Sequence, residues 1–77
     1  MSIQVKLFGL LADAAGKSEL QIESVSDTDS LKKKMFLDYP NLANKSFIVA
    51  VRKQIIGNNQ KLENGDEVAF LPPFAGG

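Results

Sequence analysis

The absence of cysteine restricts this chain most, because 77 residues must fold without any covalent cross-link. A domain of this size buries only roughly 60–65% of the surface that its unfolded chain exposes, so its core is thin. Neither a disulfide nor a zinc–thiolate site can reinforce that core. We therefore expect a single domain that is held together by its apolar residues, which make up 44% of the chain.

Histidine is also absent, and nine lysines and arginines are balanced by nine aspartates and glutamates. The chain therefore offers no thiolate nucleophile, no imidazole base and no Ser–His–Asp triad. A nucleic acid or an anionic membrane selects a basic face, so the zero net charge argues against both as partners. No apolar run approaches the roughly 20 residues of a membrane span, and the first residues lack the apolar core of a signal peptide. We expect a cytoplasmic domain that catalyses no reaction alone.

Five segments have the pattern of strands: residues 2–8, 18–23, 47–51, 54–56 and 67–71. In the first segment, Ile3, Val5 and Leu7 alternate with polar residues, which is typical of a half-buried strand. The segment 47–51 is apolar without alternation, so we expect a central strand that is covered on both faces. The last segment must end before the two prolines that follow it.

Two segments have helical signals. Residues 9–16 are bounded by glycines and rich in alanine, which indicates a short helical turn between two strands. A longer helix is expected to begin with Thr28 as its capping residue. Leu31 and Met35 are four residues apart and share one face of this helix. Pro40 ends it, because the residue before a proline is driven out of the helical region.

The order of these segments is strand, short helical turn, strand, helix and then three strands, which predicts an α+β fold. We expect one main helix to lie across one face of a sheet of four to five strands. The first and last strands should lie side by side in the middle of that sheet. Residues 1–71 would form this domain, and residues 72–77 would extend from it as a C-terminal tail.

The tail is the most informative segment, and it reads Pro72, Pro73, Phe74, Ala75, Gly76 and Gly77. A frayed end is the simpler interpretation, because termini are often poorly ordered. However, the tail leaves a strand directly, and each proline fixes its own φ and restricts the residue before it. Six extended residues span roughly 20 Å, and the glycines have no Cβ atoms to obstruct a narrow channel. This pattern favours a stiff stalk that delivers a terminal carboxylate into the active site of another protein.

A second candidate site lies on the predicted sheet. The alternation of the first strand places Phe8 on the face that should be polar, and Leu71 points outward from the last strand. Ile55 and Ile56 are adjacent, so one of them cannot reach the core. We expect Phe8, Ile55 and Leu71 to form an exposed apolar patch near the base of the tail, which is typical of an interface. The alternative is that Gly9 bends the chain and turns Phe8 inward.

Other polar clusters favour ordinary surface roles. Lys32, Lys33 and Lys34 spread around the helix and indicate a solvated face rather than an anion site. Asp66 and Glu67 are adjacent on a strand and point in opposite directions, so they are not a catalytic pair. The chain has no glycine-rich phosphate loop and no spaced set of carboxylates for a metal.

The whole chain resembles the β-grasp sulfur carriers, ubiquitin-like proteins that include the small subunits of molybdopterin synthases. The specific part of this resemblance is the run Gly65–Val68 followed by the Pro-Pro pair and the final Gly-Gly. The opening strand and the helix that begins at Thr28 match in a more general way. The chain departs from the family pattern in two places: Arg52-Lys53 stands where Asn-Gly or Asn-Gln is common, and Asp13 replaces a common arginine. Both departures lie in loops that could meet a partner.

The resemblance implies a mixed sheet and a specific chemistry. An E1-like adenylating enzyme would use ATP to activate the Gly77 carboxylate, and sulfur transfer would convert it into a thiocarboxylate. Gly76 and Gly77 would enter the large subunit of molybdopterin synthase, in a heterotetramer, and donate sulfur to a pterin precursor. This chain itself would bind no cofactor. The residues expected to contact partners are Phe8, Ile55, Leu71, Pro72, Pro73, Phe74 and Ala75.

Two alternatives remain open within the same fold. The chain could carry sulfur for the thiazole of thiamine or for tRNA thiolation. It could instead be a ubiquitin-like modifier whose tail forms isopeptide bonds. A genomic neighbour that encodes either the large subunit or a thiazole synthase would separate the two sulfur-carrier functions.

Overall fold

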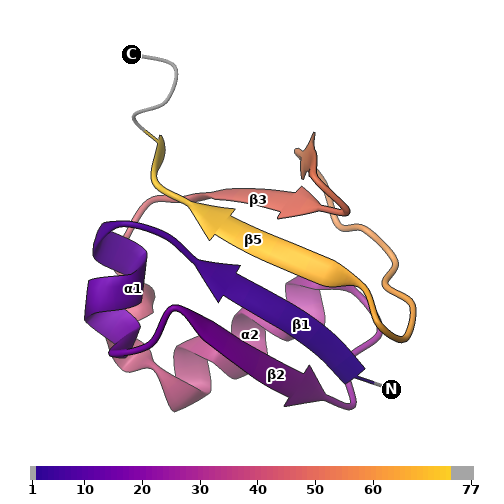
Figure 1. The fold of residues 1–77 in the computed structure, drawn as a ribbon, viewed down its shortest axis with the longest axis horizontal. Coiled ribbons are helices and arrows are strands. Elements are labelled where there is room, and N and C mark those ends of the chain that lie inside the picture. Colours follow the sequence, from indigo (N-terminus) through magenta and orange to yellow (C-terminus); the bar gives the residue numbers. More distant parts are fainter. Residues whose placement is uncertain (1, 74–77) are drawn as a thin grey trace.

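The computed structural model describes residues 2–73, which form a five-stranded sheet covered on one face by helices (Figure 1). The elements are β1 (Ser2–Leu7), α1 (Leu10–Ala15), β2 (Glu19–Glu23), α2 (Thr28–Asp38), the 3-10 helix η1 (Pro40–Leu42), β3 (Ile48–Val51), β4 (Gln54–Ile56) and β5 (Glu67–Leu71). The strand order is β2-β1-β5-β3-β4. The α+β prediction is therefore confirmed, and the arrangement is the β-grasp fold that the resemblance implies. No helix in the described part of the chain is long and apolar enough to cross a membrane.

The first and last strands lie side by side as predicted, and their pairing is parallel. Val5 is opposite Val68, and Leu7 is opposite Phe70. β2 pairs with β1 in an antiparallel direction, as β3 does with β5. A parallel pair requires a crossover connection, and here that connection contains α2, which returns the chain across one face of the sheet.

The core lies between this face of the sheet and α2. Alternate residues of β1 and β5 are buried there, as the alternation predicted. Leu31 and Met35 of α2 are fully buried against them. The ring of Phe47 stacks on Phe70 with 4.9 Å between centroids, and Phe36 meets Phe47 edge-on at 6.0 Å. The predicted core face of the helix is therefore confirmed.

The predicted cap of α2 is wrong by one residue, because Asp27 and not Thr28 caps the helix. The Ser30 N–H donates to the Asp27 carboxylate at 3.2 Å. Thr28 is the first helical residue and is 2% exposed, and its hydroxyl donates to the Asn59 side chain. The same Asn59 oxygen accepts from the Asp29 N–H at 2.9 Å. Hydrogen bonds from Ser30 and Asn59 hold the pKa of Asp27 below its usual value.

The segment 47–51 forms an inner strand of the sheet, as its apolar run predicted, but helices do not cover it on both faces. β3 begins at Ile48 and lies between β5 and the short edge strand β4, while β5 is central. Val49 and Val51 face the core, and Ala50 is 5% exposed on the opposite face. The small Ala50 side chain is thus buried between neighbouring strands without a covering helix. This burial explains why the segment 47–51 does not alternate between apolar and polar residues.

The turn between β3 and β4 is built from Arg52 and Lys53, both in the left-handed region with φ of 49° and 69°. A two-residue hairpin turn of this kind favours Asn-Gly, because side chains with a Cβ are strained at positive φ. The departure from the family pattern at these two positions therefore has a conformational cost. The Arg52 guanidinium pairs with Asp66, which ties the turn to the chain just before β5.

Replacing Leu31 with alanine should lower the free energy of unfolding by about 2–4 kcal/mol, because it empties a fully buried site. Urea denaturation followed by circular dichroism measures this change. Leu37→Ala is the matched control, since Leu37 lies on the same helix and is 81% exposed. The control should stay within about 0.5 kcal/mol of the original protein. An unchanged midpoint for Leu31→Ala would contradict this description of the core.

Replacing Lys53 with glycine should raise the free energy of unfolding by about 0.5–1 kcal/mol, since glycine adopts positive φ without strain. Lys53→Ala is the control, because it removes the same ammonium group and keeps the Cβ. Thermal unfolding of both variants separates the backbone effect from the charge effect. If Lys53→Ala gained as much stability as Lys53→Gly, the proposal that Lys53 is strained by its positive φ would be contradicted.

Candidate functional site

The sheet face opposite α2 carries the candidate site, because no helix covers it (Figure 1). Leu71 is paired with Ile48 across β5 and β3. The Phe8 N–H donates to the Phe70 carbonyl at 3.2 Å, which places Phe8 beside Leu71 at the end of β1. Ile55 is paired with Ala50 on the same face. We call Phe8, Ile48, Ile55 and Leu71 the open-face patch.

Exposure within the open-face patch differs between residues. Phe8 is 44% exposed and Ile55 is 70% exposed, while Ile48 and Leu71 are partly exposed. Gly9 does not turn Phe8 inward, so the alternative interpretation of Phe8 is wrong. Small side chains at Ala50 and Ala69 lie between the larger ones, since they are paired with each other across β3 and β5. The patch is therefore a shallow apolar surface rather than a set of separate side chains.

The sequence predicted three residues of this patch and missed Ile48. The apolar run 47–51 indicated burial on both faces, so it gave no reason to expose Ile48. The signal that could have found it is the register, because a residue opposite Leu71 must share its face. Leu10 was also missed: it is 70% exposed and follows Gly9 at the start of α1.

The base of the tail packs against the turn between β1 and α1. Pro72 is partly exposed and Pro73 is exposed. Gly9 has a φ of 58°, and a Cβ at this position would lie 3.0 Å from the Cγ atom of Pro72. The absence of a side chain at Gly9 therefore allows the first proline of the tail to approach β1 closely.

The remaining predicted tail residues, Phe74, Ala75, Gly76 and Gly77, lie outside the described residues.

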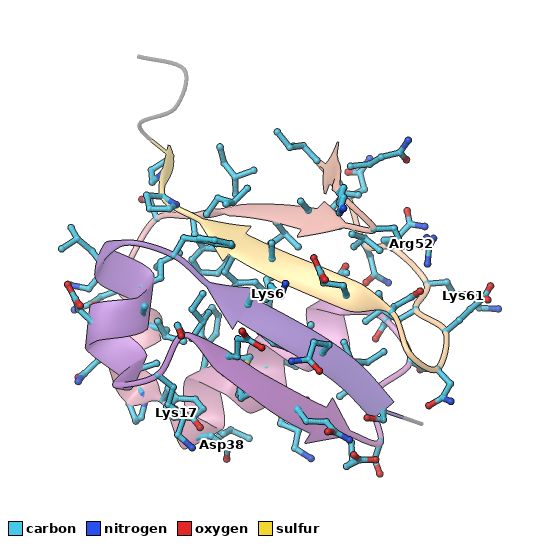
Figure 2. All side chains as sticks on the ribbon, viewed as in Figure 1. Lys6, Lys17, Asp38, Arg52 and Lys61 are labelled. Carbon is cyan, nitrogen blue, oxygen red and sulfur yellow. The ribbon has the colours of Figure 1, made fainter. Side chains whose placement is uncertain are left out.

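Polar side chains border the open-face patch on the side of β1 and β2. The Lys6 ammonium pairs with the Glu67 carboxylate at 3.4 Å. Figure 2 shows Lys6 over the strands on the face turned away from α2. The Gln4 amide donates to Glu19 at 3.3 Å, and Gln21 donates to Glu23 at 2.9 Å. The apolar area thus ends at a row of paired polar groups, which is the arrangement of an interface core and its rim.

The acidic residues in this region have structural partners. Asp66 accepts a hydrogen bond from the Glu63 N–H at 2.7 Å and pairs with Arg52. The hydrogen bond from the Glu63 backbone, together with Arg52, lowers the pKa of Asp66. Glu67 instead pairs with Lys6 on the open face. Among residues 2–73, no group of three or more acidic side chains is placed to hold a metal ion.

Comparison with known proteins agrees with this geometry. A family model described as the ThiS family matches residues 5–77. The molybdopterin synthase sulfur carrier subunit of Caenorhabditis briggsae is 31% identical over an alignment of 83 positions, which covers 100% of this chain and 99% of that protein.

Two solved structures share the fold. The small archaeal modifier protein 1 of Methanosarcina acetivorans has a TM-score of 0.83 at 26% identity, over 99% of this chain and 96% of that chain. A complex of subunits 1 and 2 of the molybdopterin-converting factor of Helicobacter pylori contains a chain with a TM-score of 0.74 at 25% identity, with full coverage of both chains. The resemblance to β-grasp sulfur carriers is thereby confirmed, and this chain belongs to the ThiS family.

Proposed function

We propose that this protein is the small, sulfur-carrying subunit of a molybdopterin synthase. The observation that carries the proposal is the similarity to the sulfur carrier subunit of Caenorhabditis briggsae, which extends over the whole chain and so includes the terminal glycines. The sulfur would be carried as a thiocarboxylate on Gly77. The residues 1–71 would serve as the docking domain and 72–77 as the donor tail.

The proposed chemistry requires no catalytic side chain from this protein. An E1-like adenylating enzyme joins the Gly77 carboxylate to the α-phosphate of ATP, and pyrophosphate leaves. A sulfide equivalent then displaces AMP, so that a carbon–sulfur bond replaces the activated carbon–oxygen bond. A thiocarboxylate is ionised and soft at neutral pH, and it attacks the pterin precursor where a carboxylate would not. The absence of cysteine and histidine from the chain is consistent with this division of labour.

The open-face patch is the proposed docking surface for the large subunit. Phe8, Ile48 and Leu71 lie near the strand end from which the tail departs, while Ile55 extends the patch to the edge strand β4. A partner that covers the patch is therefore close to the tail. The Helicobacter pylori structure, in which subunits 1 and 2 form a complex, supports a partner of this kind. We propose a heterotetramer with two copies of each subunit in the cytoplasm. The balanced charge of the chain gives no reason to add nucleic acid or a membrane to its partners.

A ubiquitin-like modifier is the second candidate function. The observation that favours it is the 26% identity with the small archaeal modifier protein 1 of Methanosarcina acetivorans. Both candidates require adenylation of Gly77, but they differ in the product. A carrier ends as a thiocarboxylate, whereas a modifier ends in an amide bond with a lysine of another protein.

Intact mass spectrometry separates the two candidates. The protein is incubated with ATP, a sulfur donor and its adenylating enzyme, and the terminal fragment is sequenced. We expect one oxygen to be replaced by sulfur within that fragment. Conjugates with lysine residues and no thiocarboxylate would instead support the modifier.

Replacing Phe8 or Leu71 with alanine should weaken binding to the large subunit by about 1–3 kcal/mol, as expected for an apolar anchor in an interface. Isothermal titration calorimetry measures the affinity, and circular dichroism verifies that each variant remains folded. Leu37→Ala is the control, because Leu37 is exposed on α2, on the covered side of the sheet. Full affinity in both patch variants would show that the partner binds elsewhere.

Deleting Gly77 should abolish thiocarboxylate formation and molybdopterin synthesis while the fold and docking persist. The deletion leaves the terminal carboxylate about 3.3 Å short of the reacting atoms. A displacement of this size removes most of the advantage of a positioned reactant. Addition of one alanine after Gly77 should fail in the same way. A truncated or extended protein that supports synthesis at the normal rate would refute the sulfur-carrier function.

A further inference from the structure

The turn before β5 places Asn64 and Gly65 at the surface. The Asp66 N–H donates to the Glu63 carbonyl at 3.0 Å, which closes a β-turn with Asn64 and Gly65 at its centre. Gly65 has a φ of 87°, whereas Asn64 does not lie in the positive-φ region, as in a type II turn. Both residues are exposed, so water and base from the solvent can reach them.

Asparagine followed by glycine is the sequence in which the asparagine side-chain amide is lost most readily. The glycine nitrogen attacks that amide, and no Cβ obstructs its approach. Asn64 is the one asparagine of this chain that precedes a glycine; the other asparagines are Asn41, Asn44, Asn58 and Asn59. The sequence therefore favours deamidation at position 64 over every other asparagine.

The reaction needs only water and a base. The Gly65 nitrogen gives its proton to the base and forms a bond with the side-chain carbon Cγ of Asn64. The bond between Cγ and Nδ2 breaks, and ammonia leaves after taking up a proton. Water then opens the cyclic succinimide on either side, which gives aspartate or isoaspartate. The rate therefore depends on how freely the Gly65 nitrogen and the Asn64 side chain can move together.

Two hydrogen bonds to the backbone of Ser2 engage both of these groups. The Ser2 N–H donates to Oδ1 of Asn64 at 2.7 Å. The Gly65 N–H donates to the Ser2 carbonyl, also at 2.7 Å. Figure 1 shows the loop before β5 beside the start of β1. We call these two bonds the Ser2 clasp, and together they restrain the side chain that would be attacked and the nitrogen that would attack it.

The Ser2 clasp continues the parallel pairing of β1 with β5. The next bond along the strands is the donation from the Gln4 N–H to the Asp66 carbonyl at 2.9 Å. Ser2 is the first residue of β1, so the clasp lies at the end of this pairing. Hydrogen bonds at strand ends open at lower free energy than those in the middle of a sheet. The clasp can therefore open while the rest of the sheet stays paired.

We propose that Asn64 is a site of spontaneous deamidation that the Ser2 clasp keeps unreacted in the folded protein. Asn64 reacts from an opened state in which the start of β1 has separated from the turn. The isoaspartate product adds one carbon to the backbone before Gly65, which moves the Gly65 N–H out of register with the Ser2 carbonyl. Deamidation thus marks chains in which this end of the pairing has opened. The proposal is independent of the proposed function.

The first test compares the folded protein with a synthetic peptide of residues 60–70, both incubated at mildly alkaline pH. Digestion and peptide mass spectrometry measure the loss of the Asn64 amide, and chromatography separates the aspartate and isoaspartate products. The folded protein should react at least about tenfold more slowly than the peptide. The other four asparagines are internal controls and should stay intact over the same time. Equal rates at Asn64 in the protein and the peptide would overturn the proposal.

The second test removes one bond of the clasp. Ser2→Pro has no N–H to donate to Asn64, and a proline is tolerated at the first residue of a strand. Ser2→Ala is the matched control, because it removes the hydroxyl and keeps the backbone N–H. Both variants carry the same N-terminal tag, so that residue 2 remains within a peptide chain, and circular dichroism verifies the fold.

Deamidation of Asn64 should be about three- to tenfold faster in Ser2→Pro than in Ser2→Ala, as expected for the loss of one hydrogen bond. Equal rates in the two folded variants would show that the clasp does not protect Asn64, and would overturn the proposal.

A third measurement needs no variant. Hydrogen exchange followed by nuclear magnetic resonance reports on the Gly65 N–H, which must leave the Ser2 carbonyl before it can exchange. This N–H should exchange more slowly in the folded protein than in the peptide of residues 60–70. Exchange at the rate of the peptide would show that the clasp is open in solution, which would also overturn the proposal.

Discussion

The parallel pairing of β1 and β5 is the interaction on which the rest of the structure depends. It joins the beginning of the described chain to its end and contributes Val5, Leu7, Val68 and Phe70 to the core. Parallel neighbours cannot be joined by a tight turn, so the chain between them must cross the sheet and supply α2. The same pairing brings Phe8 beside the strand end from which Pro72 departs. The pairing of β1 with β5 therefore determines the core, the path of the helix and the position of the base of the tail.

The single sheet performs two tasks because its strands alternate. In β5, Val68 and Phe70 are buried against α2, while Ala69 and Leu71 face the open side. A one-residue shift of register would exchange these faces and destroy both the core and the patch. The stability of the fold and the position of the open-face patch are therefore set by the same hydrogen bonds.

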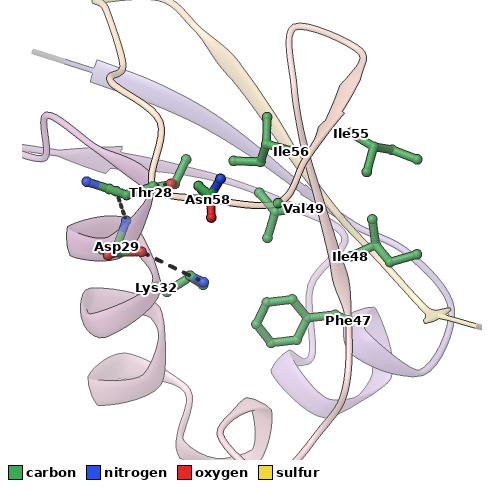
Figure 3. Close-up of a pocket in the computed structure, with 11 residues that line it drawn as sticks. Thr28, Asp29, Lys32, Phe47, Ile48, Val49, Ile55, Ile56 and Asn58 are labelled. Carbon is green, nitrogen blue, oxygen red and sulfur yellow. Dashed lines mark hydrogen bonds and ion pairs between the residues drawn. The ribbon is translucent and has the colours of Figure 1, made fainter.

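Local patterns predicted the strands, the core face of α2 and the exposure of Phe8, because each depends on neighbours within a few residues. Local patterns could not predict features that depend on contacts between residues far apart in the sequence. The Asn59 side chain satisfies the start of α2 from 30 residues away, so Thr28 looked like the cap. Ile48 is exposed because of its pairing with Leu71, which the apolar run alone does not reveal. The pocket that α2, β3 and β4 line together (Figure 3) likewise depends on how these elements lie relative to one another.

The β3–β4 hairpin is held by its neighbours more than by its own sequence. Two consecutive residues at positive φ cost about 1–2 kcal/mol each, whereas the ion pair of Arg52 with Asp66 has a half-exposed guanidinium and contributes less than this. The ion pair alone cannot offset the strain, so the pairing of β3 with β5 must supply the difference. β4 has only three residues and one neighbouring strand. A partner that covers Ile55 would therefore bury apolar area at β4, the strand that the sheet itself stabilises least.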